Sequence, residues 1–209
     1  MRMRLEPGAI TVRHRILLLL VFLGIMFAPG GASLAQAADK ADPWALCAGI
    51  VGTAERALAL PPHLLGAIAK VESGRWSRDR GAIVAWPWTV TAEGKGRFLP
   101  SKAAAIQAVE RLRARGVRNI DVGCMQVNLL YHGRRFEDLE AALDPVQNVA
   151  YAATFLAQLH RDLRSWTRAI GRYHSATPKF SGRYRLKVFR AWRAEKHAAN
   201  RLRIQAKAN

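Results

Sequence analysis

The sequence predicts a mainly helical fold of the α+β class that contains one small β-hairpin. Apolar side chains recur at three- and four-residue steps over most of residues 44–192, which is the period of an amphipathic helix. That pattern stops between residues 74 and 100, where a glycine-containing turn separates two short segments rich in β-branched and aromatic residues. Half of the 209 residues are apolar, so the chain can bury a hydrophobic core.

The N-terminal segment has the order of features of a secretory signal peptide. Residues 1–37 contain four arginines, a continuous apolar run at residues 16–27, and the cleavage-type sequence Ala35-Gln36-Ala37. An uncleaved membrane anchor is the alternative, although the apolar run is short for a full span. We therefore expect export to the periplasm, with residues 38–43 as a linker to the folded domain.

The charge of the chain predicts an anionic partner. The net charge is +18, and residues 179–209 alone contain ten basic residues and one acidic residue. We expect no nucleic-acid partner, because an exported protein does not meet chromosomal DNA and no known binding module is evident. Carboxylates of the cell wall fit the charge, and the basic tail at residues 193–209 also suits an anionic membrane surface. A solvated helix end with a disordered tail is the alternative for that segment.

Two helices are predicted at the start of the domain. The first begins at Trp44, and its apolar positions continue to Leu58. Pro61-Pro62 ends it and fixes the first turn of a second helix. The inward positions of the second helix are Leu64, Leu65, Ile68 and Val71. Ser73-Gly74 ends this helix.

The segment after the second helix predicts a hairpin and then a third helix. Residues 86–91 are extended in character, Glu93-Gly94-Lys95-Gly96 is a turn sequence, and residues 97–99 return as a second strand. Ser101 is a suitable N-cap for a helix that ends at Gly116.

Three more helices complete the predicted domain, which spans residues 44–192. Asp144-Pro145 supplies a cap and a proline at the first helical position. Ser165 caps the next helix, and Thr177-Pro178 ends it. The last helix places four large side chains on one face: Tyr184, Val188, Phe189 and Trp192.

Glu72 is the candidate catalytic residue. It shares the inward face of its helix with Leu65 and Ile68. Partial desolvation raises the pKa of a carboxyl group, which keeps a proton available for general acid catalysis near neutral pH. On periodicity alone, a helix-end glutamate paired with Lys70 or Arg75 is the alternative.

Four segments extend this interpretation. They are residues 68–74 (IAKVESG), 123–128 (GCMQVN), 148–156 (NVAYAATFL) and 169–175 (AIGRYHS). In this order they resemble the Glu-Ser, Gly-Leu-Met-Gln-Ile, Asn-led helix and Ala-Tyr-Asn motifs of the soluble lytic transglycosylase family. The resemblance implies a lysozyme-like fold and an enzyme that cleaves the glycan strands of peptidoglycan without a metal or other cofactor. It is closest to small exported variants associated with secretion and conjugation machines, so such an envelope-spanning apparatus is a candidate partner.

The resemblance also implies roles for individual residues. Glu72 is the expected acid/base, and Tyr173 is expected to hold Glu72 in position through its hydroxyl group. The expected substrate-binding residues are Ser73, Met125, Gln126, Asn128 and His174. The implied product carries a 1,6-anhydro ring on N-acetylmuramic acid. A lysozyme-type muramidase that uses water and a non-catalytic peptidoglycan-binding assembly factor are the alternatives.

Two departures from the family motifs affect these expectations. His174 stands where the motif has asparagine, and a structural histidine is the alternative to a substrate contact there. Cys124 stands where the motif has leucine, and a disulfide with Cys47 is possible in an oxidising compartment. Two buried apolar cysteines are the alternative.

The segment between Glu72 and Gln126 is longer than is common in the family. It holds Trp86 and Trp88, which face the same side if the segment is a strand. Exposed indoles there can stack on sugar rings, whereas a hydrophobic plug that holds the insertion to the core is the alternative. Asp121, the nearest second carboxylate, is interpreted as a loop or helix cap.

Overall fold

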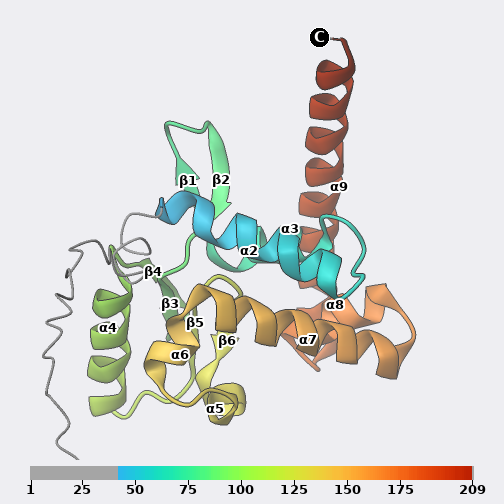
Figure 1. Cartoon of the computed structure of the whole chain (residues 1–209). Coiled ribbons are helices and arrows are strands. Elements are labelled where there is room, and N and C mark those ends of the chain that lie inside the picture. The colour runs from blue at the N-terminus through green and yellow to red at the C-terminus, as the bar shows by residue number, and fades with distance from the viewer. Residues whose placement is uncertain (1–41, 209) are drawn as a thin grey trace, which may run out of the picture.

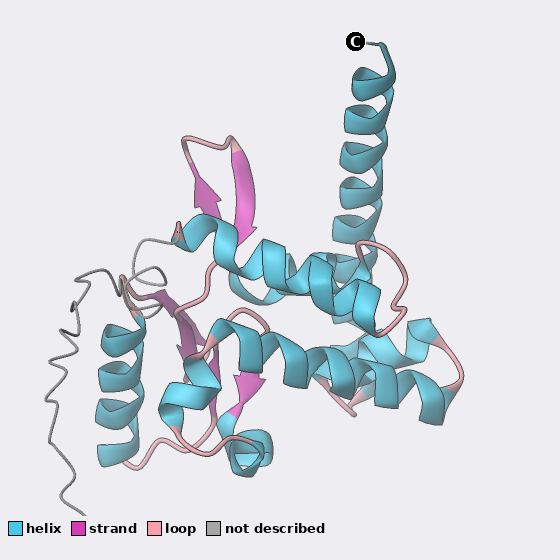
Figure 2. Ribbon diagram, in the orientation of Figure 1, coloured by secondary structure: helices cyan, strands magenta, loops and turns pink. Residues whose placement is uncertain are grey.

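The computed structural model describes residues 42–208, and helices dominate it (Figure 2). The predicted α+β, mainly α class is confirmed. The predicted signal peptide at residues 1–37 and most of the predicted linker lie outside the described residues.

The elements follow one another as Figure 1 shows. The helices are α2 (Pro43–Ala57), α3 (Leu64–Ser73), α4 (Lys102–Ala114), α5 (Leu129–His132), α6 (Leu139–Leu143), α7 (Pro145–Leu163), α8 (Trp166–His174) and α9 (Pro178–Ala208), with a short 3-10 helix at Gly133–Arg135. The strands are β1 (Gly74–Ser77), β2 (Ala82–Ala85), β3 (Thr89–Ala92), β4 (Lys95–Phe98), β5 (Ile120–Val122) and β6 (Val127–Asn128).

Side-chain caps fix the helix starts that the sequence predicts. The Ser101 hydroxyl accepts a hydrogen bond from the Ala104 amide at 3.2 Å, and the Asp144 carboxylate accepts one from the Gln147 amide at 3.0 Å. Ser165 caps α8 in the same way. Each cap satisfies an amide that has no partner inside the helix. Asp42 caps α2, so this helix begins within the predicted linker.

The β structure is larger than predicted. The predicted hairpin is present as β3 and β4, with Val90 opposite Arg97. It belongs to an antiparallel sheet with the strand order β4-β3-β5-β6, and a separate hairpin is formed by β1 and β2. These additional strands have two to four residues each. Segments that short carry little alternation, so the sequence did not reveal them.

The Trp86-Pro87-Trp88 segment connects the two sheets and packs inward. Trp86 is 5% exposed, and its indole N–H donates to the Leu99 carbonyl at 2.7 Å. Its ring meets those of Trp44 and Trp88 edge to face, with centroids 4.8 Å and 5.7 Å away. Trp86 therefore holds the insertion to the body of the protein, and sugar stacking is wrong for this residue. Trp88 is half-buried against the sheet core, so its contact with sugar stays a prediction.

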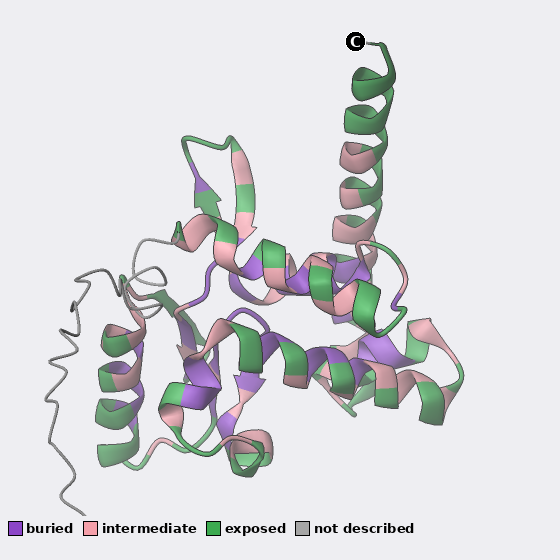
Figure 3. Ribbon diagram, viewed as in Figure 1, coloured by how far each residue is buried: buried purple, intermediate pink, exposed green. Residues whose placement is uncertain are grey.

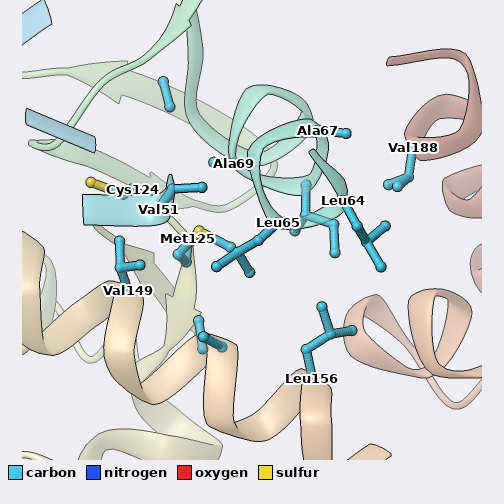
Figure 4. Packing of buried hydrophobic residues seen from close by; sticks show 14 of the residues in the cluster. Val51, Leu64, Leu65, Ala67, Ala69, Cys124, Met125, Val149, Leu156 and Val188 are labelled. Carbon is cyan, nitrogen blue, oxygen red and sulfur yellow. The ribbon is translucent and has the colours of Figure 1, made fainter. Parts of the chain in front are cut away.

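The core has two parts. One is formed mainly by α2, α3, α7, α8 and α9, and Figure 4 shows Leu64, Leu65 and Leu156 meeting at its centre. The other lies between the four-stranded sheet and the helices α4 and α6. Cys47 and Cys124 form a disulfide with a Cα–Cα distance of 5.8 Å, which ties α2 to the loop between β5 and β6.

Helix α9 both packs on the domain and extends from it. Its first half packs against α3 and α8. The last contact of this helix with α3 that the side chains make is an ion pair between Glu195 and Lys70, and beyond it the side chains become mostly exposed, as Figure 3 shows. The predicted basic tail is therefore helical to Ala208. Among residues 42–208, none of the helices combines the length and apolarity needed to cross a membrane.

Candidate active site

A cavity of about 390 Å³ opens beside the end of α3, which is within the size range of small-ligand sites. We call the residues from α3, α7 and α8 its helical wall and those from β3, β5 and β6 its sheet wall. The helical wall contributes Glu72, Tyr151, Ala152, Phe155, Tyr173 and His174. The sheet wall contributes Thr91, Asp121, Val127 and Asn128, with Asn119 and Gln126 next to it.

Glu72 lies on the helical wall at the last turn of α3. Its carboxylate oxygen Oε1 accepts a hydrogen bond from the hydroxyl of Tyr184 at 2.5 Å. The pKa of Glu72 is raised to about 8, mainly because the carboxyl group is desolvated by its surroundings. The nearby charge of Asp121 also raises this pKa, whereas the hydrogen bond from Tyr184 and the charge of Lys187 lower it. Glu72 therefore keeps a proton near neutral pH.

Asp121 and Asn128 face the same cavity from neighbouring strands. They are paired residues in the register of β5 and β6, and the Asn128 amide donates to the Asp121 carboxylate at 2.7 Å. The same amide donates to Asn119 at 2.6 Å. Burial raises the pKa of Asp121, and the hydrogen bond from Asn128 lowers it. The interpretation of Asp121 as a loop or helix cap is wrong, because it is a strand residue whose carboxylate lines the cavity.

A buried asparagine shapes the loop between β5 and β6. The Asn148 side chain accepts from the Met125 amide and donates to the carbonyls of Val122 and Ala142, each at 3.0 Å. Gly123 has a φ of +84°, and a Cβ atom there would lie 2.4 Å from the Asn148 amide nitrogen. Only glycine fits both requirements, so these two residues together set the path of the loop.

Gln126 is held in an unusual backbone conformation at the mouth of this loop. Its φ of 48° lies in the left-handed region, which is uncommon for a residue with a side chain. Its side-chain amide donates to the carbonyls of Thr89 and Gly123, both at 3.1 Å. These bonds orient the side chain on the cavity wall, as expected for a group placed to contact a ligand.

Comparison with known proteins identifies the domain. The family model described as the Transglycosylase SLT domain matches residues 50–185, which is well over half of the chain. The chain belongs to this family. No curated protein and no solved structure matches the chain. Membership confirms the resemblance seen in the sequence, with its lysozyme-like fold, and indicates lytic transglycosylase activity on peptidoglycan.

In the transglycosylase domain, the tyrosine that is hydrogen-bonded to Glu72 differs from the one that the sequence predicted. The hydroxyl of Tyr173 donates to the Met125 carbonyl at 2.9 Å, and it is Tyr184 that donates to Glu72. The predicted bond from Tyr173 is therefore wrong, although Tyr173 lines the same cavity. The sequence did place Tyr184 on the inward face of α9, and a buried hydroxyl group needs a partner, so this was the available signal.

Two predicted substrate contacts of the transglycosylase domain are structural instead. Ser73 is 1% exposed, and its hydroxyl donates to the Cys124 carbonyl at 2.7 Å. Met125 is fully buried, and its side chain lies in the core beside Val149 and Leu65 (Figure 4). Both predictions are wrong, because these buried side chains hold the loop between β5 and β6 in place from the core and do not line the cavity. Trp86 and Trp88 are likewise not among the residues that line the cavity.

Three other predicted substrate contacts do line the cavity, namely Gln126, Asn128 and His174. The imidazole of His174 stacks on Tyr184 with ring centroids 4.4 Å apart. Burial, aided by the charge of Lys187, lowers the pKa of His174. The imidazole ring therefore packs against Tyr184, whose hydroxyl group is hydrogen-bonded to Glu72.

Three further aromatic residues of this site were not singled out from the sequence. Tyr151 and Phe155 lie one turn apart on α7 and line the cavity, and Tyr131 on α5 is 76% exposed at its edge. Tyr151 and Phe155 are four residues apart within the motif at residues 148–156, and this spacing could have indicated that they share one face of the helix. Among residues 42–208, no cluster of three or more His, Cys, Asp or Glu side chains is arranged to hold a metal ion.

Proposed function

We propose that the protein is a lytic transglycosylase in which Glu72 is the only acid/base. The bond cleaved is the β-1,4 linkage between N-acetylmuramic acid and N-acetylglucosamine, and the product carries a 1,6-anhydro ring. The observation that supports this best is a carboxyl group with a pKa of about 8 on the wall of a ligand-sized cavity, hydrogen-bonded to the phenol of Tyr184.

The reaction balances with this one carboxyl group. In the first step Glu72 gives its proton to the glycosidic oxygen, and the bond from that oxygen to C1 of the muramic sugar breaks. The carboxylate of Glu72 that remains then accepts the proton of the C6 hydroxyl group, while the oxygen of that hydroxyl group bonds to C1. Glu72 is protonated again, and no water is consumed. A pKa near the working pH suits both halves of this cycle.

Asp121 supports a second candidate, a lysozyme-type hydrolase. Glycosidases that use water employ two carboxyl groups on either side of the scissile bond. Asp121 and Glu72 line the same cavity, and the charge of one affects the pKa of the other. In this case Asp121 either activates the water molecule that attacks C1 or bonds to C1 itself, in an intermediate that water then hydrolyses, and the product is a reducing sugar.

Mass spectrometry of the products tests both candidates. Purified peptidoglycan is digested with the protein, and Glu72→Gln is the inactive control. We expect muropeptides that lack one water relative to reducing ends. Reducing ends that disappear in Asp121→Asn establish the hydrolase instead. Peptidoglycan that is bound but left intact indicates a non-catalytic assembly factor.

Periplasmic location is part of the same proposal, because the substrate lies there. The segment that predicts export, residues 1–37, lies outside the described residues. Contact of the basic tail at residues 193–209 with an anionic membrane surface remains a prediction from the sequence, as does a partnership with a secretion or conjugation apparatus.

A further inference from the structure

A second hollow of about 230 Å³ is also lined by Glu72. Glu72 and His174 line both this hollow and the main cavity, so the two meet at the proposed acid. The second hollow is completed mainly by α9, which contributes Phe180, Arg183 and Lys187. We call it the α9 hollow.

The α9 hollow differs from the main cavity in charge. Arg183 and Lys187 are four residues apart on one helix, so they share a face. Lys187 is near enough to Glu72 and His174 for its charge to lower the pKa of both. Within residues 42–208, neither Arg183 nor Lys187 has a carboxylate within ion-pair distance. The main cavity holds Asp121 instead.

This asymmetry matters because the sugar backbone of peptidoglycan carries no charge. The carboxylates of peptidoglycan lie on the substituent at C3 of the muramic sugar. This substituent consists of a lactyl group and the peptide stem. Arg183 and Lys187 can form ion pairs with a carboxylate of this substituent, whereas the sugar rings offer them no negative charge. An arginine and a lysine provide several donors to a carboxylate, and the guanidinium can bind it with two parallel bonds.

We propose that Arg183 and Lys187 bind a carboxylate of the peptide stem, and that the α9 hollow thereby selects stem-bearing muramic acid beside Glu72. Phe180, which is 53% exposed, supplies an apolar side to the same hollow. This inference rests on the proposed function and adds a preference for substituted strands over bare ones.

Substrates that differ only in charge test the inference. Intact glycan strands are compared with strands whose stem carboxylates have been converted to amides, and with strands stripped of their stems, which keep only the lactyl carboxylate. The variant is Arg183→Gln with Lys187→Gln. The matched control is Arg193→Gln with Arg201→Gln, which removes two exposed charges from the same helix outside the hollow.

We expect the wild type and the control to prefer intact over amidated strands by about tenfold in kcat/KM, and the double variant to lose this preference. The ratio for one enzyme cancels any change in the acidity of Glu72 that Lys187→Gln causes. A preference that survives in the double variant overturns the inference. If stripped strands also retain the advantage in the wild type, the lactyl carboxylate is the group that is bound.

A binding measurement separates this inference from the proposed function. Glu72→Gln protein, with and without the two α9 substitutions, is sedimented with intact or amidated peptidoglycan. Selective loss of binding to the intact material in the substituted protein supports the α9 hollow even if the wild type proves not to cleave. Equal binding in both proteins overturns it, whatever the activity.

Discussion

The two walls of the main cavity each carry a carboxyl group, but the groups are held differently. Glu72 on the helical wall receives its hydrogen bond from a phenol on α9, and burial raises its pKa to about 8. Asp121 on the sheet wall receives its bond from the amide of Asn128 on the adjacent strand. Burial raises the pKa of both groups, and the hydrogen bond that each receives lowers it, so the surroundings of each carboxyl group set how readily it holds a proton.

Removal of the helical-wall carboxyl group has the largest expected effect. Glu72→Gln should lower kcat by about 10²–10⁴-fold, because a general acid contributes that much to the rate. Binding to peptidoglycan should remain, since glutamine keeps the shape of the side chain. Turbidity loss of purified peptidoglycan measures the rate, and sedimentation measures the binding. Activity close to that of the wild type moves the catalytic role away from Glu72.

The same substitution should stabilise the fold at alkaline pH. A carboxyl group whose pKa is higher in the folded state than in the unfolded chain favours folding below its unfolded pKa, and this contribution is lost as pH rises through the folded pKa. For Glu72 this window runs from 4.5 to about 8. Urea unfolding at pH 5 and pH 9 should show Glu72→Gln gaining at least about 1.4 kcal/mol relative to wild type. A constant difference across this range contradicts the raised pKa.

Substitutions of Tyr184 and Tyr173 should have different effects on the pH dependence of the rate. Tyr184→Phe removes the bond that lowers the pKa of Glu72, so the alkaline limb of the rate profile should move to higher pH, and kcat should fall about tenfold. Tyr173→Phe is the matched control, because it removes one hydroxyl group that bonds to the Met125 carbonyl. It should cost about 1 kcal/mol of stability and leave that limb in place. Equal shifts in both variants refute the assignment of Tyr184.

The sheet-wall carboxyl group should move the same limb in the opposite direction. The charge of Asp121 raises the pKa of Glu72, so Asp121→Asn should shift the alkaline limb to lower pH. For a transglycosylase we expect kcat at its optimum to change by less than about tenfold, since Asp121 transfers no proton. The measurement is kcat/KM between pH 5 and pH 9. A shift to higher pH contradicts the electrostatic coupling of the two walls.

The smallest effect on activity is expected from the tryptophans between the sheets. Trp88→Ala should leave affinity for glycan strands within about twofold, because Trp88 packs on the sheet core and does not line the cavity. Its cost should appear as lower stability, as for other large-to-small changes in packed regions. Thermal unfolding and glycan binding on the same sample check this. A clear loss of affinity in folded protein reopens a role in sugar binding.

Local sequence patterns predicted several residues of the candidate site as well as most elements of the fold. Helical spacing placed Glu72 on an inward face, and motif order placed Gln126, Asn128 and His174 at one site. Ser73 at the end of α3 and Met125 in the loop between β5 and β6 were wrongly assigned to the cavity, because a motif names a segment without saying which side chains face the cavity. Only the packing of α3 against that loop decides this.

The sequence by itself determined the predominance of helix, most helix boundaries and the identity of the candidate acid. The helices and their boundaries follow from spacing and from capping groups within a few residues of each other, whereas the candidate acid follows from the order of the four motifs that resemble the family. The tertiary structure alone decided that Tyr184 and not Tyr173 bonds to Glu72, that the Trp86 indole is buried, and that Arg183 and Lys187 border the site. Tyr184 lies 112 residues from Glu72, and a contact over that distance depends on how α9 packs on α3, which no local pattern records.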